Sequence, residues 1–198
     1  NIRLEAICSR EQAERLLAVE RDPDTTDDAV AHWIAERRVD IGFVVLPDER
    51  FDTQLLVEDQ LVAVLPLGHP LARQKSINLS DLRHLPFIMT AAGATAHVEK
   101  LFEAAGLHLN VQHRYSQILT IIKTVESGAG VSIVASLALS DQVMAMCPGA
   151  VKKPLAQPAR RSVGLAVPNL KQASPAVLAF LKTAKALVPK LRQDLTLR

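Results

Sequence analysis

The sequence has 198 residues, of which 48% are hydrophobic and 22% are charged. This balance is typical of a globular protein and excludes an intrinsically disordered chain. At about 150 residues per domain, the length allows one or two domains and excludes a large multidomain enzyme. The formal net charge of +2 is mixed along the chain, and it is too small for the basic face of a nucleic-acid-binding domain.

The cysteines and the apolar runs indicate the compartment. Cys8 and Cys147 lie near opposite ends of the sequence, so they indicate neither a disulfide framework nor a metal-ligand cluster, and we expect no cofactor. No apolar run reaches the roughly 18 residues of a membrane span, and the first residues lack the pattern of an export signal. We therefore expect a cytoplasmic chain that does not contact a membrane.

Short runs rich in Val, Ile and Leu alternate with longer stretches of helical spacing, as in an α/β protein. In chain order, strands are predicted at residues 2–7, 39–46, 61–65, 87–89, 111–115, 131–134 and 163–167. Helices are predicted at residues 27–35, 95–105, 116–127 and 174–187, with Pro189 closing the last one. Ser116 is expected as an N-cap, and Gly106 and Gly128 are expected as left-handed residues after helix ends.

Three stretches combine these elements with specific turns. The first is RRVDIGFVVLP at residues 37–47, and the second is EDQLVAVLPLGHPLA at residues 58–72, followed by INLSDLRHLPFIM at residues 77–89. The third is VESGAGVSIVA at residues 125–135. In this order and spacing they resemble the effector-binding domain of LysR-type transcriptional regulators, over roughly residues 27–187.

The resemblance implies a two-lobed α/β fold of the periplasmic-binding-protein type (type 2), with two crossing strands and a small-molecule cleft between the lobes. Lobe I would comprise residues 1–66 and 163–198, and lobe II residues 67–162. Residues 2–7 are similar to the family's first strand or to its second, and these alternatives stay open. The resemblance also implies a homodimer or homotetramer, and DNA binding only through a helix-turn-helix domain that this chain lacks.

The stretch TAAGAT, residues 90–95, precedes a predicted helix. A helix N-terminus presents unpaired N–H groups and suits a small anion such as a carboxylate. Gly93 would let a ligand approach the backbone, while Thr90 and Thr95 would add hydroxyl donors. The stretch is also compatible with a plain capped loop, but the resemblance favours ligand binding because family members bind effectors at the matching loop.

The predicted ligand-binding residues have ordinary structural alternatives. Thr26 can be an N-cap, the valines can be core residues, and Gln117 can be a solvated side chain. With the resemblance taken into account, the predicted ligand-binding residues are Thr26, Val45, Thr90, Ala92, Gly93, Gln117 and Val134.

Evidence for an enzyme is weak in this sequence. It has no Gly-x-Ser-x-Gly elbow and no phosphate-binding loop. The adjacent acids Glu58 and Asp59 are expected to point apart into solvent, and His69 is expected to be a turn residue. We therefore expect an effector-sensing regulatory domain and no enzymatic activity. The alternatives are a solute-binding protein of a transport system with the same fold and, third, a small metabolic enzyme.

Overall fold

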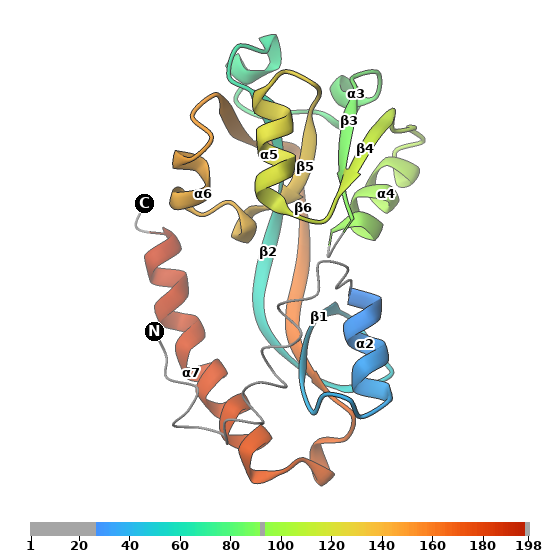
Figure 1. Cartoon of the computed structure of the whole chain (residues 1–198), viewed down its shortest axis with the longest axis vertical. Helices are drawn as coiled ribbons and strands as arrows, with labels where there is room; N and C mark the ends of the chain where they lie inside the picture. Colours follow the sequence, from blue (N-terminus) through green and yellow to red (C-terminus); the bar gives the residue numbers. More distant parts are fainter. Residues whose placement is uncertain (1–26, 92–93, 197–198) are drawn as a thin grey trace. The chain divides into compact units, whose positions relative to one another are not determined.

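A computed structural model describes residues 27–91 and 94–196 (Figure 1). Helices and strands alternate along this part of the chain, which confirms the α/β prediction. The predicted strand at residues 2–7 lies outside the described residues, as do Thr26, Ala92 and Gly93 from the predicted site.

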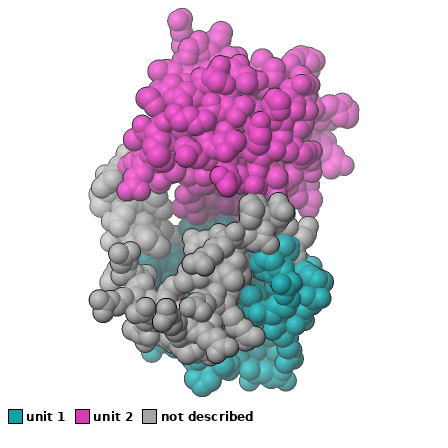
Figure 2. Space-filling model, in the orientation of Figure 1, with its two compact units in different colours: residues 1–58, 162–198 teal, residues 59–161 magenta. Residues whose placement is uncertain are grey.

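The chain divides into two compact units, coloured separately in Figure 2. Unit 2 runs from Asp59 to Arg161, and unit 1 is formed by the described residues on either side of it. Two long strands, β2 (Asp52–Pro66) and β6 (Ala150–Val167), each contribute to both units. The chain therefore passes between the units twice, within β2 and within β6.

Unit 1 contains α2 (Asp27–Ala35), β1 (Gly42–Leu46), η4 (Leu170–Gln172) and α7 (Pro175–Thr196) beside its parts of β2 and β6. Strand β1 pairs antiparallel with β6, from Gly42 opposite Ala166 to Leu46 opposite Ser162. Neighbouring residues of β6 belong to different core clusters: Ala166 packs with α2, and Leu165 packs with α7. Because successive strand residues point to opposite faces, the two helices cover opposite faces of this sheet.

Unit 2 builds its core around β3 (Phe87–Thr90), β4 (Val111–Tyr115) and β5 (Ser132–Ala135). Strands β3 and β4 are parallel, β5 pairs antiparallel with β2, and a parallel bridge joins Phe87 to Val131. Helix α4 (Thr95–Ala104) and helix α5 (Ile118–Glu126) contribute to two separate core clusters. The shorter elements of the unit are η2 (Pro70–Arg73), α3 (Leu79–Leu82), η3 (Ser136–Ala138) and α6 (Asp141–Ala145).

Most sequence-predicted elements are confirmed. Helix α2 has the predicted bounds, and α4 and β4 match within one residue. Gly106 and Gly128 adopt the left-handed conformation, with φ of 65° and 83°. The side chain of His69 accepts a hydrogen bond from the Leu71 amide at the start of η2, which agrees with its predicted role in a turn.

Three local predictions are wrong. The N-cap of α5 is Gln117 rather than Ser116, because the first helical residue is Ile118, one residue later than a cap at Ser116 implies. Helix α7 continues beyond Pro189 to Thr196, since a proline removes one backbone hydrogen bond and need not end a helix. Strands β2 and β6 extend far beyond the apolar runs that predicted them.

Within the described residues, no helix is both long and apolar enough to cross a lipid bilayer.

Candidate functional site

The carboxyl ends of β3 and β4 lie side by side in unit 2. Thr90, the last residue of β3, is in register with Tyr115, the last residue of β4. The amide of Ala91 then donates a hydrogen bond to the Tyr115 carbonyl at 2.8 Å. Helix α4 follows β3 and helix α5 follows β4, so both helices begin near this edge of the sheet. Ligands of open α/β sheets bind outside the carboxyl ends of the strands.

Neither helix is capped by the side chain of its N-cap residue. The N-cap of α4 is Ala94, and the N-cap of α5 is Gln117, whose side chain makes no capping hydrogen bond. The first-turn N–H groups of a helix have no partner within the helix and carry a partial positive charge. We call the edge where β3 and β4 end and α4 and α5 begin the β3–β4 edge. This edge can therefore accept a small anion.

Thr90 and Thr95 have different surroundings in the structure. The Thr95 hydroxyl donates a hydrogen bond to the Thr90 carbonyl at 2.5 Å. Its only proton is therefore directed within the loop rather than toward a ligand, unlike the donor role expected from the sequence. Thr90 is only 6% exposed although it is polar.

The other predicted residues occupy different surroundings. Gln117 is exposed at the β3–β4 edge. Val134 lies in β5, is 2% exposed and packs in the core cluster that contains Ile121 and Ile122. Val45 is half-buried in unit 1, opposite Val163 of β6. The structure therefore brings Thr90 and Gln117 to one edge and gives the side chain of Val134 a core environment.

A buried ion pair was missed by the sequence interpretation. Asp59 is 2% exposed and accepts hydrogen bonds from Nε and Nη2 of Arg161, at 3.2 and 3.1 Å. The prediction that Glu58 and Asp59 point apart is confirmed by their exposed and buried positions, but the prediction that both are solvated is wrong. Pairing of β2 with β6 brings Arg161 to Asp59 from 102 residues away. Only an alternation of exposed and buried residues along β2, with an acid among the buried ones, could have indicated this pair.

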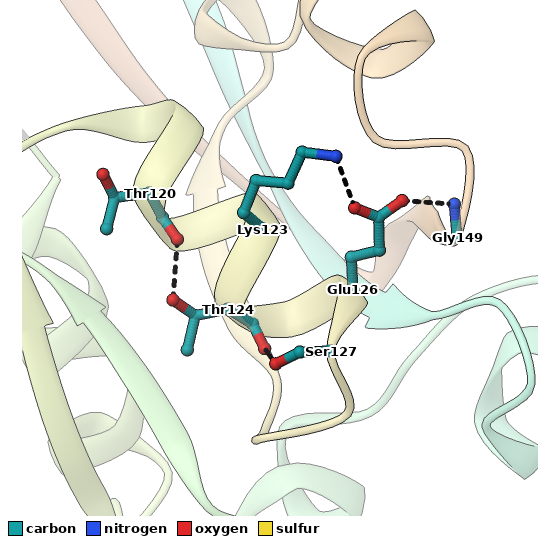
Figure 3. Close-up of polar contacts among 6 residues, drawn as sticks. All are labelled: Thr120, Lys123, Thr124, Glu126, Ser127 and Gly149. Carbon is teal, nitrogen blue, oxygen red and sulfur yellow. Dashed lines mark hydrogen bonds and ion pairs between the residues drawn. The ribbon is translucent and has the colours of Figure 1, made fainter.

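A second polar cluster lies at the C-terminal end of α5 (Figure 3). Glu126 accepts hydrogen bonds from Lys123 Nζ at 2.7 Å and from the Gly149 amide at 2.8 Å. The Lys123 hydrogen bond is the main cause that lowers the pKa of Glu126, and the same bond raises the pKa of Lys123. This cluster holds the turn before β6 against α5, so its role is structural.

Metal-binding residues do not gather in the part of the chain that the structure describes: no group of three or more His, Cys, Asp or Glu side chains there could hold an ion. Cys147 is a buried free thiol, and desolvation raises its pKa. The arrangement at the β3–β4 edge supports binding of a small molecule through backbone N–H groups and neutral polar side chains.

Comparison with known proteins identifies relatives of this chain. The chain is 33% identical over 82% of its length to an uncharacterized HTH-type transcriptional regulator, YvbU, of Bacillus subtilis (strain 168), and the match covers 55% of that protein. The chain thus spans a little over half the length of this curated relative.

Solved structures show the same fold. The effector binding domain of QuiR in complex with shikimate has a TM-score of 0.73 at 17% identity, and the match covers 93% of each chain. The Synechocystis PCC6803 CcmR regulatory domain in complex with 2-PG has a TM-score of 0.72 at 20% identity, covering 91% of this chain and 92% of that one. These likenesses confirm the predicted two-lobed, periplasmic-binding-protein-like fold.

The family comparison covers most of the sequence. The model described as "LysR substrate binding domain" matches residues 17–188. The chain therefore belongs to the LysR substrate-binding domain family of transcriptional regulators.

Proposed function

We propose that this domain senses a small anionic metabolite, such as a carboxylate, that binds at the β3–β4 edge of unit 2. The observation that carries the proposal is the start of two helices, both without a side-chain cap, where two parallel strands end. A carboxylate placed there would accept hydrogen bonds from backbone N–H groups, and the helix dipoles would favour its charge. Ala92 and Gly93 would contribute from the segment between β3 and α4.

The relatives support this class of ligand. Shikimate, bound by QuiR, carries a carboxylate, and CcmR binds 2-PG. Gln117 remains a proposed contributor at this edge, and Thr26, Val45 and Val134 remain proposed ligand-binding residues of the domain.

We propose further that the complete protein is a cytoplasmic regulator that binds DNA through a helix-turn-helix domain and acts as a homodimer or homotetramer. Effector binding would shift the domain between conformations and so change the assembly of the oligomer. Similarity to HTH-type transcriptional regulators favours this function over a transport protein of the same fold and over an enzyme.

The test is a thermal-shift screen of organic acids, beginning with shikimate and benzoate, followed by calorimetric titration of each hit. A ligand at about 100 times its Kd should stabilise the domain by about 2.7 kcal/mol. Thr90→Ala and Gly93→Val should each weaken the hit at least about tenfold, the equivalent of about 1.4 kcal/mol.

Matched controls separate the site from general effects of substitution. Gly68→Val adds a side chain where nothing lies within 4 Å of the new Cβ, and Thr53→Ala removes an exposed hydroxyl from unit 1. Both controls should keep the affinity of the unchanged domain. If Thr90→Ala and Gly93→Val also keep it, the proposed site is wrong.

A further inference from the structure

Two side-chain pairs connect β2 and β6 where the chain passes between the units. The unit boundary falls between Glu58 and Asp59 on β2 and between Arg161 and Ser162 on β6. In unit 1, the Ser162 hydroxyl donates a hydrogen bond to Glu58 Oε1 at 2.7 Å. In unit 2, Arg161 forms the ion pair with Asp59. The last residue of each unit on one strand is therefore bonded to the last residue of the same unit on the other.

The ion pair in unit 2 is shielded from water. The side chains of Asp59 and Arg161 are only 1% and 14% exposed, whereas those of Glu99 and Arg114, which form a surface pair in the same unit, are 50% and 51% exposed. A charge pair shielded from water interacts more strongly than an exposed pair. Separating it would leave a buried charge without its partner, which is strongly unfavourable.

Asp59 also bonds a third segment. Its Oδ1 accepts a hydrogen bond from the Leu137 amide at 3.1 Å, while its Oδ2 accepts the two bonds from Arg161. Leu137 lies in η3, immediately after β5. One carboxylate thus joins both connecting strands to the segment that follows β5.

We propose that the Asp59–Arg161 pair is a cross-tie that makes the two connecting strands bend as one body and couples their bending to the end of β5. Any change in the orientation of the units must pass through these two strands, because they are the two places where the chain crosses the boundary. With the cross-tie formed, the strands cannot shift separately at this point. A role of the cross-tie in transmitting effector binding between the units rests on the proposed function. Its mechanical effect on the two strands does not require a ligand.

Hydrogen–deuterium exchange of the ligand-free chain tests the mechanical effect. Asp59→Asn keeps the size of the side chain and an acceptor for Leu137 but removes the charge. We expect exchange to rise at least about tenfold in residues 57–62, 136–139 and 159–164, and to stay within about twofold in α4. Glu99→Gln, which breaks the exposed pair, should change none of these segments.

Unchanged exchange in the three segments, or an equal rise in α4, would show that the pair only contributes to the general stability of unit 2, and would overturn the proposal. Arg161→Lys provides a second measurement if Asp59→Asn does not fold. It keeps the charge and loses the two-nitrogen contact, so we expect a smaller rise confined to the same three segments.

Distance measurements between spin labels test the freedom of the units directly. Labels at Glu49→Cys in unit 1 and Arg83→Cys in unit 2 would be placed on exposed positions, in a chain that carries Cys8→Ser. Asp59→Asn should broaden the distance distribution relative to Glu99→Gln, and an unchanged width would overturn the cross-tie. Because no ligand is present, failure to find an effector would not alter this result, and loss of the cross-tie would not disprove effector binding.

Discussion

Replacing Gly130 by alanine tests how closely the segment before β5 approaches the segment before β3. A Cβ atom at Gly130 would lie 2.4 Å from the carbonyl oxygen of Pro86 and 3.0 Å from its carbonyl carbon. The same carbonyl oxygen accepts the hydrogen bond of the Val131 amide at 2.9 Å. The new methyl group would therefore push the backbone apart at the point where β5 joins β3.

The structure ranks three glycine substitutions in unit 2. Gly130→Ala brings a side chain against backbone, which cannot move aside as a flexible side chain would, so we expect a loss of about 3 kcal/mol, at the upper end of overpacking costs. Gly128→Ala has open space but a φ of 83°, which costs about 1 kcal/mol in left-handed strain. Gly68→Ala has open space and no positive φ, so we expect a change within about 0.5 kcal/mol.

Differential scanning calorimetry measures these losses without assuming a single two-state transition for both units. A loss of 1 kcal/mol lowers the Tm of a unit of this size by about 4 to 8 °C. The single tryptophan, Trp33, lies in α2 of unit 1, so its fluorescence should follow the stability of unit 1. If Gly130→Ala is no more destabilising than Gly128→Ala, the close approach of Gly130 to Pro86 is wrong.

Two further substitutions test packing and charge in unit 2. Phe102 is 1% exposed and packs edge-on against Phe87, with 6.1 Å between ring centroids. Phe102→Ala should therefore lower the free energy of unfolding by about 3 to 5 kcal/mol in calorimetry, and a decrease below about 1 kcal/mol would contradict this packing. The hydrogen bond from Lys123 is the main cause that lowers the pKa of Glu126 below its ordinary value of 4.5. The ionised carboxylate therefore stabilises the folded unit above pH 4.5, and this stabilisation is lost as the pH falls through the lower pKa of the folded state. The Tm difference between the unchanged chain and Glu126→Gln should therefore shrink from about pH 6 to about pH 3, and a constant difference would exclude this contribution.

The sequence predicted the elements whose burial pattern is regular. Strands β3 and β5 are buried along their whole length and appear in the sequence as short, mainly apolar runs. The first half of β2 and the middle of β6 are largely exposed, and β6 contains Pro154 and Pro158. Their full length depends on pairing with distant segments, such as Ile77 with Leu155, and local residue pattern carries no signal of such pairing.

The polar residues show the same limit. Thr90 was predicted as a site residue because a small-residue loop and a helix follow it, and both signals are local in the sequence. Asp59 was predicted to be solvated because adjacent acids such as Glu58 and Asp59 usually point apart into solvent. Its burial follows from Arg161 and Leu137, which lie 102 and 78 residues away in the sequence. The burial of Asp59 can therefore be explained only once the position of β6, which carries Arg161, is known.

The incorrect N-cap prediction at Ser116 supports the proposed site. Helices α6 and α7 begin with serines whose hydroxyls accept hydrogen bonds from first-turn amides, Ser140 from Val143 and Ser174 from Val177. Helices α4 and α5 instead begin at Ala94 and Gln117, without a side-chain cap. A serine cap would occupy the N–H groups that an anion needs, and it would stabilise the helix by about 1 kcal/mol. That both uncapped starts lie at the β3–β4 edge is the pattern expected where local stability is given up for binding.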